Sequence, residues 1–270
     1  MHIEDRDFFR LRDYIKSNFG VNLEKKRALI ESRLTNAIAQ SEFEGFHDYI
    51  DDVLADASGA KVNELMTRLT TNYTYFMREE THYKFMVDVA LPQWTAAIRD
   101  HDLRIWSAGC ASGEEAYTIV MVLNEYFGSA KRNWDTTVLA TDISTKVLEM
   151  AKTGIYPKEH FEYLPKTWES KYFTQVGPEE YKVSESMAKD VVFGQFNLMS
   201  EFNRFKKKFH IIFCRNVMIY FDVPTKSALV KRFHDTLETG GYLFIGLSET
   251  LSGISGDFQQ IAPAIYKRVK

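Results

Sequence analysis

Apolar positions over residues 1–75 recur three and four apart, which is the spacing of one face of an α-helix. The pattern runs through FFRLRDYIKSNF, KRALIESRLTNAIAQ, FHDYIDDVLA and VNELMTRLT. Gly20, Gly45 and the stretch 57–60 separate these segments and act as helix breakers. The sequence therefore predicts a small all-helical N-terminal domain over residues 1–75, followed by a linker over residues 76–90.

From about Leu103 the pattern changes to short apolar runs that alternate with helical spacing. Five runs read as strands, several of them almost continuously apolar as in buried parallel sheets: LRIWSAG, TTVLATDI, DVVFGQFN, FHIIFCRN and GYLFIGLS. Three helical patterns lie between them, and the last ends at Gly240-Gly241, which predicts a helix C-cap. The alternation predicts a doubly wound α/β domain over residues 91–270, to which the final FQQIAPAIYKRVK adds one or two edge strands.

One segment, residues 156–189, interrupts this alternation. The runs YFTQV and EYKVS flank Gly177-Pro178, which predicts a small antiparallel β-subdomain inserted into the sheet topology. The insertion is longer than a connection requires, so we interpret it as either a recognition surface or a lid.

Composition narrows the functional classes. The chain of 270 residues is 45% apolar and 26% charged, as in soluble globular proteins, and its net charge of −3 argues against a protein built to hold nucleic acid. The N-terminus has no apolar signal segment, and no run reaches the roughly 18 apolar residues of a membrane span. We therefore expect a cytoplasmic protein without membrane insertion, and a monomer as the default. Cys110 and Cys214 fit no metal-ligand spacing, so we expect reduced thiols and no metal.

The stretch SAGCASGEEAY (107–117) joins a predicted strand to a predicted helix, the usual place for a ligand in an open α/β sheet. It lacks both the Gly-Lys-Ser/Thr of a P-loop and the GxGxxG of dinucleotide sites. Glu114 and Glu115 would repel a phosphate at the helix N-terminus. Gly109 and Gly113 indicate close approach of a ligand. A cationic ligand with a ribose and no phosphate, such as S-adenosylmethionine (SAM), fits these features better.

Polar residues at later strand ends support such a site. Asp142 follows the second strand, where a carboxylate accepts hydrogen bonds from a ribose diol; the alternative is that it only caps the next helix. Asn197 can bond the adenine edge while Leu198 packs on the ring. For Asn197, Asn216 and Arg215 the alternatives of turn residues and a surface charge remain open.

Several of these pieces together resemble one family, the CheR-type chemotaxis receptor methyltransferases. The motifs that carry the resemblance span nearly the whole chain in order: TTNYTYFMRE (70–79), SAGCASGEEAYTIVM, ATDIS, FNL, FCRNVMIYFD and GLSET. The resemblance implies methyl transfer from SAM to glutamate side chains of chemoreceptor cytoplasmic helices, forming γ-methyl esters and S-adenosylhomocysteine. It also implies a Rossmann-like SAM-dependent methyltransferase domain with an inserted antiparallel β-subdomain.

The resemblance assigns roles position by position. Family cofactor contacts, together with Gly109 of the loop, fall on Asn72, Thr74, Arg78, Gly109, Glu115, Asp142, Asn197, Leu198, Arg215 and Asn216. The family's arginine and tyrosine near the transferred methyl match Arg78 and Tyr220. Tyr75 and Met77 depart from the commonest family forms without changing a polar position.

The implied chemistry needs no catalytic base. A glutamate with a pKa near ~4.3 is already ionised at neutral pH, so its oxygen is nucleophilic. The absence of a Ser-His-Asp or Cys-His arrangement is then expected, and we interpret His82, His210 and His234 as structural or surface residues.

Substrate contacts are open to two interpretations. One predicted helix region carries four cations that would meet acidic receptor helices or simply form a solvated face: Lys25, Lys26, Arg27 and Arg33. FKKKFH (205–210) is interpreted as a solvated loop. In some family members the inserted subdomain docks a tethering peptide at the receptor C-terminus.

Two other functional classes fit the sequence less well. A SAM-binding sensor would tolerate loss of Arg78 or Tyr220, both of which are present. A nicotinamide oxidoreductase is disfavoured by Glu114 and Glu115 and by the missing GxGxxG.

Overall fold

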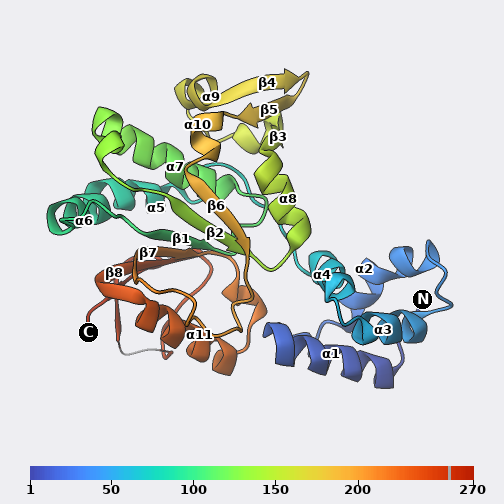
Figure 1. Cartoon of the computed structure of the whole chain (residues 1–270). Helices are drawn as coiled ribbons and strands as arrows, with labels where there is room; N and C mark the ends of the chain where they lie inside the picture. The colour runs from blue at the N-terminus through green and yellow to red at the C-terminus, as the bar shows by residue number, and fades with distance from the viewer. Residues whose placement is uncertain (255–256) are drawn as a thin grey trace.

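The computed structural model describes residues 1–254 and 257–270. The N-terminal region forms four helices, as the apolar spacing predicts: α1 (Asp5–Phe19), α2 (Arg27–Ala39), α3 (Phe46–Ala55) and α4 (Ala60–Leu69). Their apolar faces enclose a core of their own, at whose centre lie Leu11, Ile30, Ile50 and Leu65. This helical unit lies to one side of the sheet, next to one end of its strands (Figure 1).

The remainder is built on one mixed sheet with the order β6-β2-β1-β7-β8-β10-β9. The strands from β6 to β8 are parallel and β10 pairs antiparallel with both neighbours. The bounds are β1 (Ile105–Ala108), β2 (Val138–Asp142), β6 (Val191–Gln195), β7 (Phe209–Cys214), β8 (Leu237–Ile245), β9 (Phe258–Ala262) and β10 (Ile265–Arg268). The predicted edge strands are therefore confirmed, as is the predicted parallel sheet.

Helices cover both faces of this sheet. On one face lie α5 (Glu80–Phe85), the π-helix η1 (Met86–Ala90), α6 (Leu91–Ala97) and α7 (Glu114–Phe127), and on the other lies α11 (Val223–Thr236) (Figure 1). Further short elements are η2 (Gly128–Asn133), α8 (Thr145–Thr153) and η4 (Met218–Tyr220). Neighbouring β1 residues show the two-sided burial: Ile105 belongs to the core under α7, and Trp106 to the core under α11.

The stretch 76–90, expected to be a linker, packs instead as part of this α/β unit. Tyr83 and Met86 are buried in the same core as Ile105. The buried positions Tyr83, Met86, Ala90 and Leu91 recur three and four apart along α5, η1 and the start of α6, so the spacing of a helix that packs on the sheet is present in this stretch.

The predicted antiparallel subdomain is confirmed, and the structure adds a third strand, β3, to the two predicted runs, giving the order β3-β5-β4. Its elements are β3 (Ile155–Pro157), η3 (Lys158–Phe161), α9 (Lys166–Tyr172), β4 (Phe173–Gly177), β5 (Glu180–Val183) and α10 (Glu185–Ala188). Tyr156, Phe161 and Phe173 surround the ring of Phe76, with ring centroids 5.0 Å from it in each case. The subdomain is therefore fixed to the segment that precedes α5.

The predicted C-cap at Gly240-Gly241 is wrong. Helix α11 ends at Thr236, and Leu237 already pairs with Phe209 as the first residue of β8. The glycines instead allow a bend in this strand, where the register against β7 shifts. Gly240 has a φ of +83°, and a Cβ on Gly241 would lie 2.8 Å from the carbonyl oxygen of Glu238.

Two buried histidines give the fold a predicted pH dependence. Burial, with the nearby guanidinium groups of Arg215 and Arg104 respectively, lowers the pKa of both His82 and His210 to about 4. In the unfolded chain both rings titrate near ~6.5, so the unfolded state binds more protons between these values. We therefore expect the melting temperature to fall as the pH falls from about 6.5 to about 4.

His210→Asn tests this, because an Asn oxygen can still accept the Arg104 backbone N–H that His210 Nδ1 accepts at 3.0 Å. The variant should show a shallower loss of melting temperature than the wild type over the same pH range. An unchanged slope in His210→Asn would contradict the assignment.

Candidate functional site

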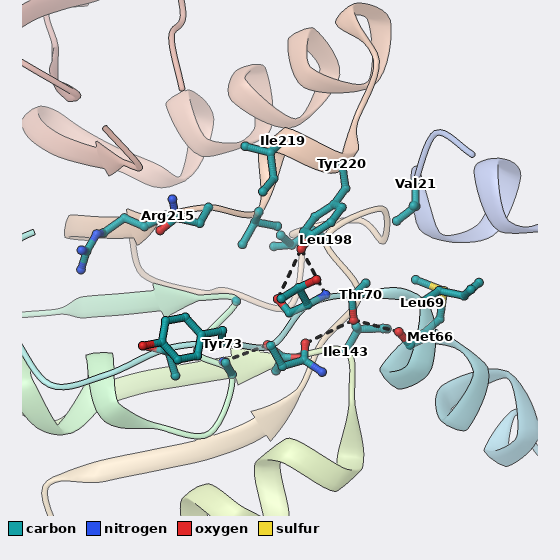
Figure 2. Close-up of a pocket in the computed structure, with 18 of the residues that line it drawn as sticks. Val21, Met66, Leu69, Thr70, Tyr73, Ile143, Leu198, Arg215, Ile219 and Tyr220 are labelled. Carbon is teal, nitrogen blue, oxygen red and sulfur yellow. Dashed lines mark hydrogen bonds between the residues drawn. The ribbon is translucent and has the colours of Figure 1, made fainter. Parts of the chain in front are cut away.

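A cavity of about 660 Å³ opens at the carboxyl ends of β1, β2 and β7, between the sheet and the helical unit. Figure 2 shows its labelled walls: Leu198, Arg215, Ile219 and Tyr220 from the sheet side, and Val21, Met66 and Leu69 from the helical unit. The segment 70–75 crosses between them. A cavity of this size at strand ends is typical of a small-molecule site.

The loop between β1 and α7, here called the glycine loop, contains Gly109 and Gly113, and only one of these two glycines lines the cavity. Gly109 lines the cavity and has a φ of +98°, and a Cβ there would lie 2.4 Å from Val217 Cγ2. Gly113 has the same φ but a Cβ on it would meet Ala151 and the hydroxyl of Tyr156. Gly113 therefore serves the contact of α7 with α8, and its interpretation as a ligand-facing residue is wrong.

The two glutamates of the loop also separate. Glu115 lines the cavity and accepts a hydrogen bond from Ser107 Oγ at 2.6 Å. Glu114 is fully buried away from it, accepts from Ser112 Oγ, and lies 2.7 Å from His160 Nδ1. Of the two carboxylates only Glu115 lines the cavity, because successive residues at a helix start point in different directions.

Asp142 lies at the end of β2 and lines the cavity. Its carboxylate accepts the backbone N–H groups of Ala111 at 3.0 Å and Ser144 at 2.9 Å, and burial raises its pKa. The helix-cap alternative is wrong, since Ser144 is the N-cap of α8 and its side chain accepts from Val147 N. Asp142 thus ties the glycine loop to the second strand.

Arg215 is a buried cation at the site, and its guanidinium makes several hydrogen bonds. Its side chain is 2% exposed, which rules out the surface-charge alternative. It donates to Glu79 Oε2 at 3.2 Å and to Glu115 Oε2 and the Tyr83 hydroxyl at 3.1 and 2.9 Å, and it also donates to the Arg78 carbonyl oxygen. Arg215 lines the cavity while its donors hold the cavity wall together.

Both strand-end asparagines line the cavity and also serve turns. Asn197 donates to the Asn18 carbonyl oxygen of α1 at 2.8 Å and accepts from Met199 N, so it joins the two units. Asn216 has a φ of +59°, and its backbone N–H donates to Glu249 Oε2 at 2.9 Å. Leu198, beside Asn197, provides apolar lining.

The segment before α5 supplies three of the expected cofactor contacts to the cavity lining: Asn72, Thr74 and Arg78. Asn72 Oδ1 accepts from the Thr70 hydroxyl at 3.2 Å, and Thr74 is buried. Arg78 donates to the Tyr73 carbonyl oxygen at 2.9 Å, and its Cζ lies 5.9 Å from the centre of the Tyr75 ring.

Tyr220 meets the segment 70–75 at Thr71 and is also held by the helical unit. Its hydroxyl is 3.3 Å from the Thr71 carbonyl oxygen and 3.2 Å from the Thr71 nitrogen, contacts drawn as dashed lines in Figure 2. Its own carbonyl oxygen accepts the Asn22 N–H at 2.8 Å, and Val21 bridges to Phe221. The two residues expected near the transferred methyl thus face one cavity.

The four cations of the predicted substrate helix do not act as one face. Lys26 and Arg33 line the cavity, and Arg33 donates to Thr71 Oγ1 at 2.8 Å. Arg27 instead donates to the Ile3 carbonyl oxygen and to Asp5, with its guanidinium 4.5 Å above the Phe8 ring. Lys25 is exposed. Only Lys26 and Arg33 therefore keep a place at the cavity.

Sequence reasoning missed the lining from the helical unit, notably Val21, Leu23 and Met66. Their apolar side chains have no signal that separates a cavity wall from a helix core. It also missed Glu79, whose carboxylate reaches Arg215 across 136 positions of sequence.

The polar groups that line the cavity fit SAM. Asp142 and Glu115 place two carboxylates at the wall beside Gly109, which suits a cationic ligand with hydroxyl groups. Among the described residues that line the cavity no histidine occurs, and no group of three or more acidic, histidine or cysteine side chains could hold a metal ion. In the same described part of the chain, no helix combines the length and apolarity that crossing a bilayer requires.

Known proteins of one family match this chain over nearly its whole length. The family described as the CheR methyltransferase SAM-binding domain matches residues 72–266, and the CheR all-alpha domain matches residues 6–70. The chemotaxis protein methyltransferase of Borreliella burgdorferi is 42% identical over 99% of this chain and 96% of its own length.

The chemotaxis protein methyltransferase of Escherichia coli is 33% identical over 98% of this chain and 91% of its own length. A solved rRNA methylase of Streptococcus thermophilus matches 70% of this chain and 95% of its own length, with 11% identity and a TM-score of 0.40. The chain belongs to the CheR methyltransferase family, and SAM is its cofactor.

Proposed function

We propose that this protein transfers the methyl group of SAM to glutamate side chains on the cytoplasmic helices of chemoreceptors, forming γ-methyl esters and S-adenosylhomocysteine. The observation that carries the proposal is the placement of Arg78 and Tyr220 around the same cavity as Asp142 and Glu115. This arrangement supports one site with a cofactor wall and a separate pair of groups for a substrate carboxylate.

Bound SAM supplies a sulfonium methyl group that is already electrophilic. The residues proposed to hold it are Asn72, Thr74, Gly109, Glu115, Asp142, Asn197, Leu198 and Asn216, which line the cavity. Asp142 suits ribose hydroxyls, because a buried carboxylate with two backbone N–H partners keeps further acceptor capacity. Arg215 acts on this wall through Glu115.

The substrate glutamate needs alignment and not deprotonation. Its pKa of ~4.3 leaves it ionised at neutral pH, so the absence of a histidine among the described lining residues is consistent with the reaction. We assign Arg78 the orientation of that carboxylate, since a guanidinium offers paired donors to two oxygens. The Tyr220 hydroxyl is assigned a second hydrogen bond to it. Orientation of this kind is worth several kcal/mol, about 7–11 in the best intramolecular cases.

Two surfaces are proposed for the receptor. Lys26 and Arg33 border the cavity and would attract an acidic helix around the target glutamate. Strand β4 is an edge of the inserted sheet, so its free backbone groups suit addition of a tethering peptide as a further strand.

Labelled SAM and receptor cytoplasmic fragments test the proposal. We expect label that is released by base, as methyl esters are, and much less label on a fragment whose target glutamates are replaced by glutamine. SAM binding by calorimetry without base-labile label would overturn the proposal and favour a SAM-binding sensor.

A further inference from the structure

The turn 76–79 presents Arg78 to the cavity and no other of its four residues. Both neighbours of Arg78 have left-handed backbone, with φ of +62° at Met77 and +59° at Glu79. Neither is a glycine, so this conformation is unfavourable and persists only where surrounding contacts enforce it. The contacts that enforce it therefore set where the guanidinium lies.

The first half of the turn is held by the inserted subdomain and α7. Phe76 donates its N–H to the His160 carbonyl oxygen at 3.1 Å, and its ring is fully buried. Met77 N donates to Thr118 Oγ1 at 3.3 Å, and that hydroxyl donates to the Glu114 carbonyl oxygen within α7.

The second half is held by the Glu79 side chain, which is 12% exposed. One carboxylate oxygen accepts from Arg215 Nε at 3.2 Å, and the other accepts from Leu247 N at 3.2 Å, just after β8. Arg215 also donates to the carbonyl oxygen of Arg78 itself. Glu79 and Arg215 thus fasten the main chain on both sides of the Arg78–Glu79 peptide to the ends of β7 and β8.

We propose that Glu79 is a positioning residue for Arg78. Its carboxylate does not line the cavity, and it acts by keeping Arg215 and the loop after β8 fixed to the turn. The proposal rests on the role of Arg78 in the proposed function. It goes further in separating a residue that holds the turn from the residue that meets the substrate.

Glu79→Gln is the test variant, because glutamine keeps the size of the side chain and removes the charge that binds Arg215. We expect kcat for receptor methylation to fall about tenfold or more, since small misplacement of an orienting group costs up to about 100-fold. The SAM dissociation constant should stay within about threefold, and Glu80→Gln, at the exposed neighbouring position, should change neither quantity.

A double-mutant cycle with Arg78→Ala separates positioning from general damage. If Glu79 acts through Arg78, Glu79→Gln should cause no further loss of kcat once Arg78 is alanine. Multiplicative losses, or a loss of SAM affinity as large as the loss of kcat, would overturn the proposal.

Amide hydrogen exchange of the SAM-free protein gives a readout that does not depend on methylation. Peptides covering 76–80 and 245–249 should exchange faster in Glu79→Gln than in wild type and Glu80→Gln. Thr118→Val, which removes the acceptor of Met77 N–H with little change in shape, should speed exchange at 76–80 alone. Unchanged exchange in both variants would contradict the proposal. If the variants exchange faster as expected but the wild-type protein methylates no receptor fragment, the proposed function is refuted instead.

Discussion

Arg78→Ala is expected to lower kcat for the proposed receptor methylation about 100-fold while the SAM dissociation constant changes less than about threefold. The guanidinium lies at the cavity beside Tyr73 and Tyr75. A cation there would act mainly by holding the substrate carboxylate in line with the methyl group. Loss of that orientation lowers kcat more than it weakens SAM binding. Initial rates of transfer from radiolabelled SAM give kcat, and calorimetry of SAM binding gives the dissociation constant.

Two control variants sharpen this expectation. Arg78→Lys keeps the charge and loses the planar pair of donors, so its kcat should lie between those of wild type and Arg78→Ala. Lys84→Ala, at an exposed position of α5, should behave as wild type. Equal losses of kcat and SAM affinity in Arg78→Ala would assign Arg78 to the cofactor alone.

Asp142→Asn is expected to weaken SAM binding about 10- to 100-fold, which corresponds to the ~1–3 kcal/mol of a disrupted buried hydrogen-bonding group. The Asp142 carboxylate accepts the N–H groups of Ala111 and Ser144 with separate oxygens. Asparagine keeps one acceptor and turns an NH₂ group towards the other N–H. Both the glycine loop and the ligand's hydroxyl groups would then lose a partner.

Calorimetry of SAM binding measures this effect directly, with Asp48→Asn at an exposed position of α3 as the control. Circular dichroism melting checks that the variant is folded. An unchanged SAM dissociation constant would mean that Asp142 serves only the local backbone and not the cofactor.

The sequence predicts the fold well where the periodicity is unambiguous. The helices of residues 1–75 bury one face each, so their spacing identifies them. Runs such as FHIIFC in β7 are buried at every position, and their short length and their β-branched and aromatic residues identify them as strands. It fails at Gly240-Gly241, because a glycine pair is equally suited to a helix end and to a bend in a strand. Only the pairing of Leu237 with Phe209 decides between these.

The site is predictable to the extent that it depends on strand ends. Asp142, Asn197 and Arg215 follow strands whose carboxyl ends meet at one edge, and all three reach the cavity. Orientation within a motif is not predictable in this way: Glu114 and Glu115 are adjacent, yet only Glu115 faces the cavity. Contacts between distant segments, such as Asn22 with Tyr220, exist only once the two units are packed together.

The proposed reaction places the methyl group on glutamate side chains of a receptor. Tandem mass spectrometry of a receptor fragment incubated with the wild-type protein and SAM shows which side chain carries the added methyl group. We predict one added methyl group on a glutamate side chain, removed by mild base and strongly reduced with Arg78→Ala. Methylation confined to another residue type, or an unmodified fragment despite measured SAM binding, would contradict the claim.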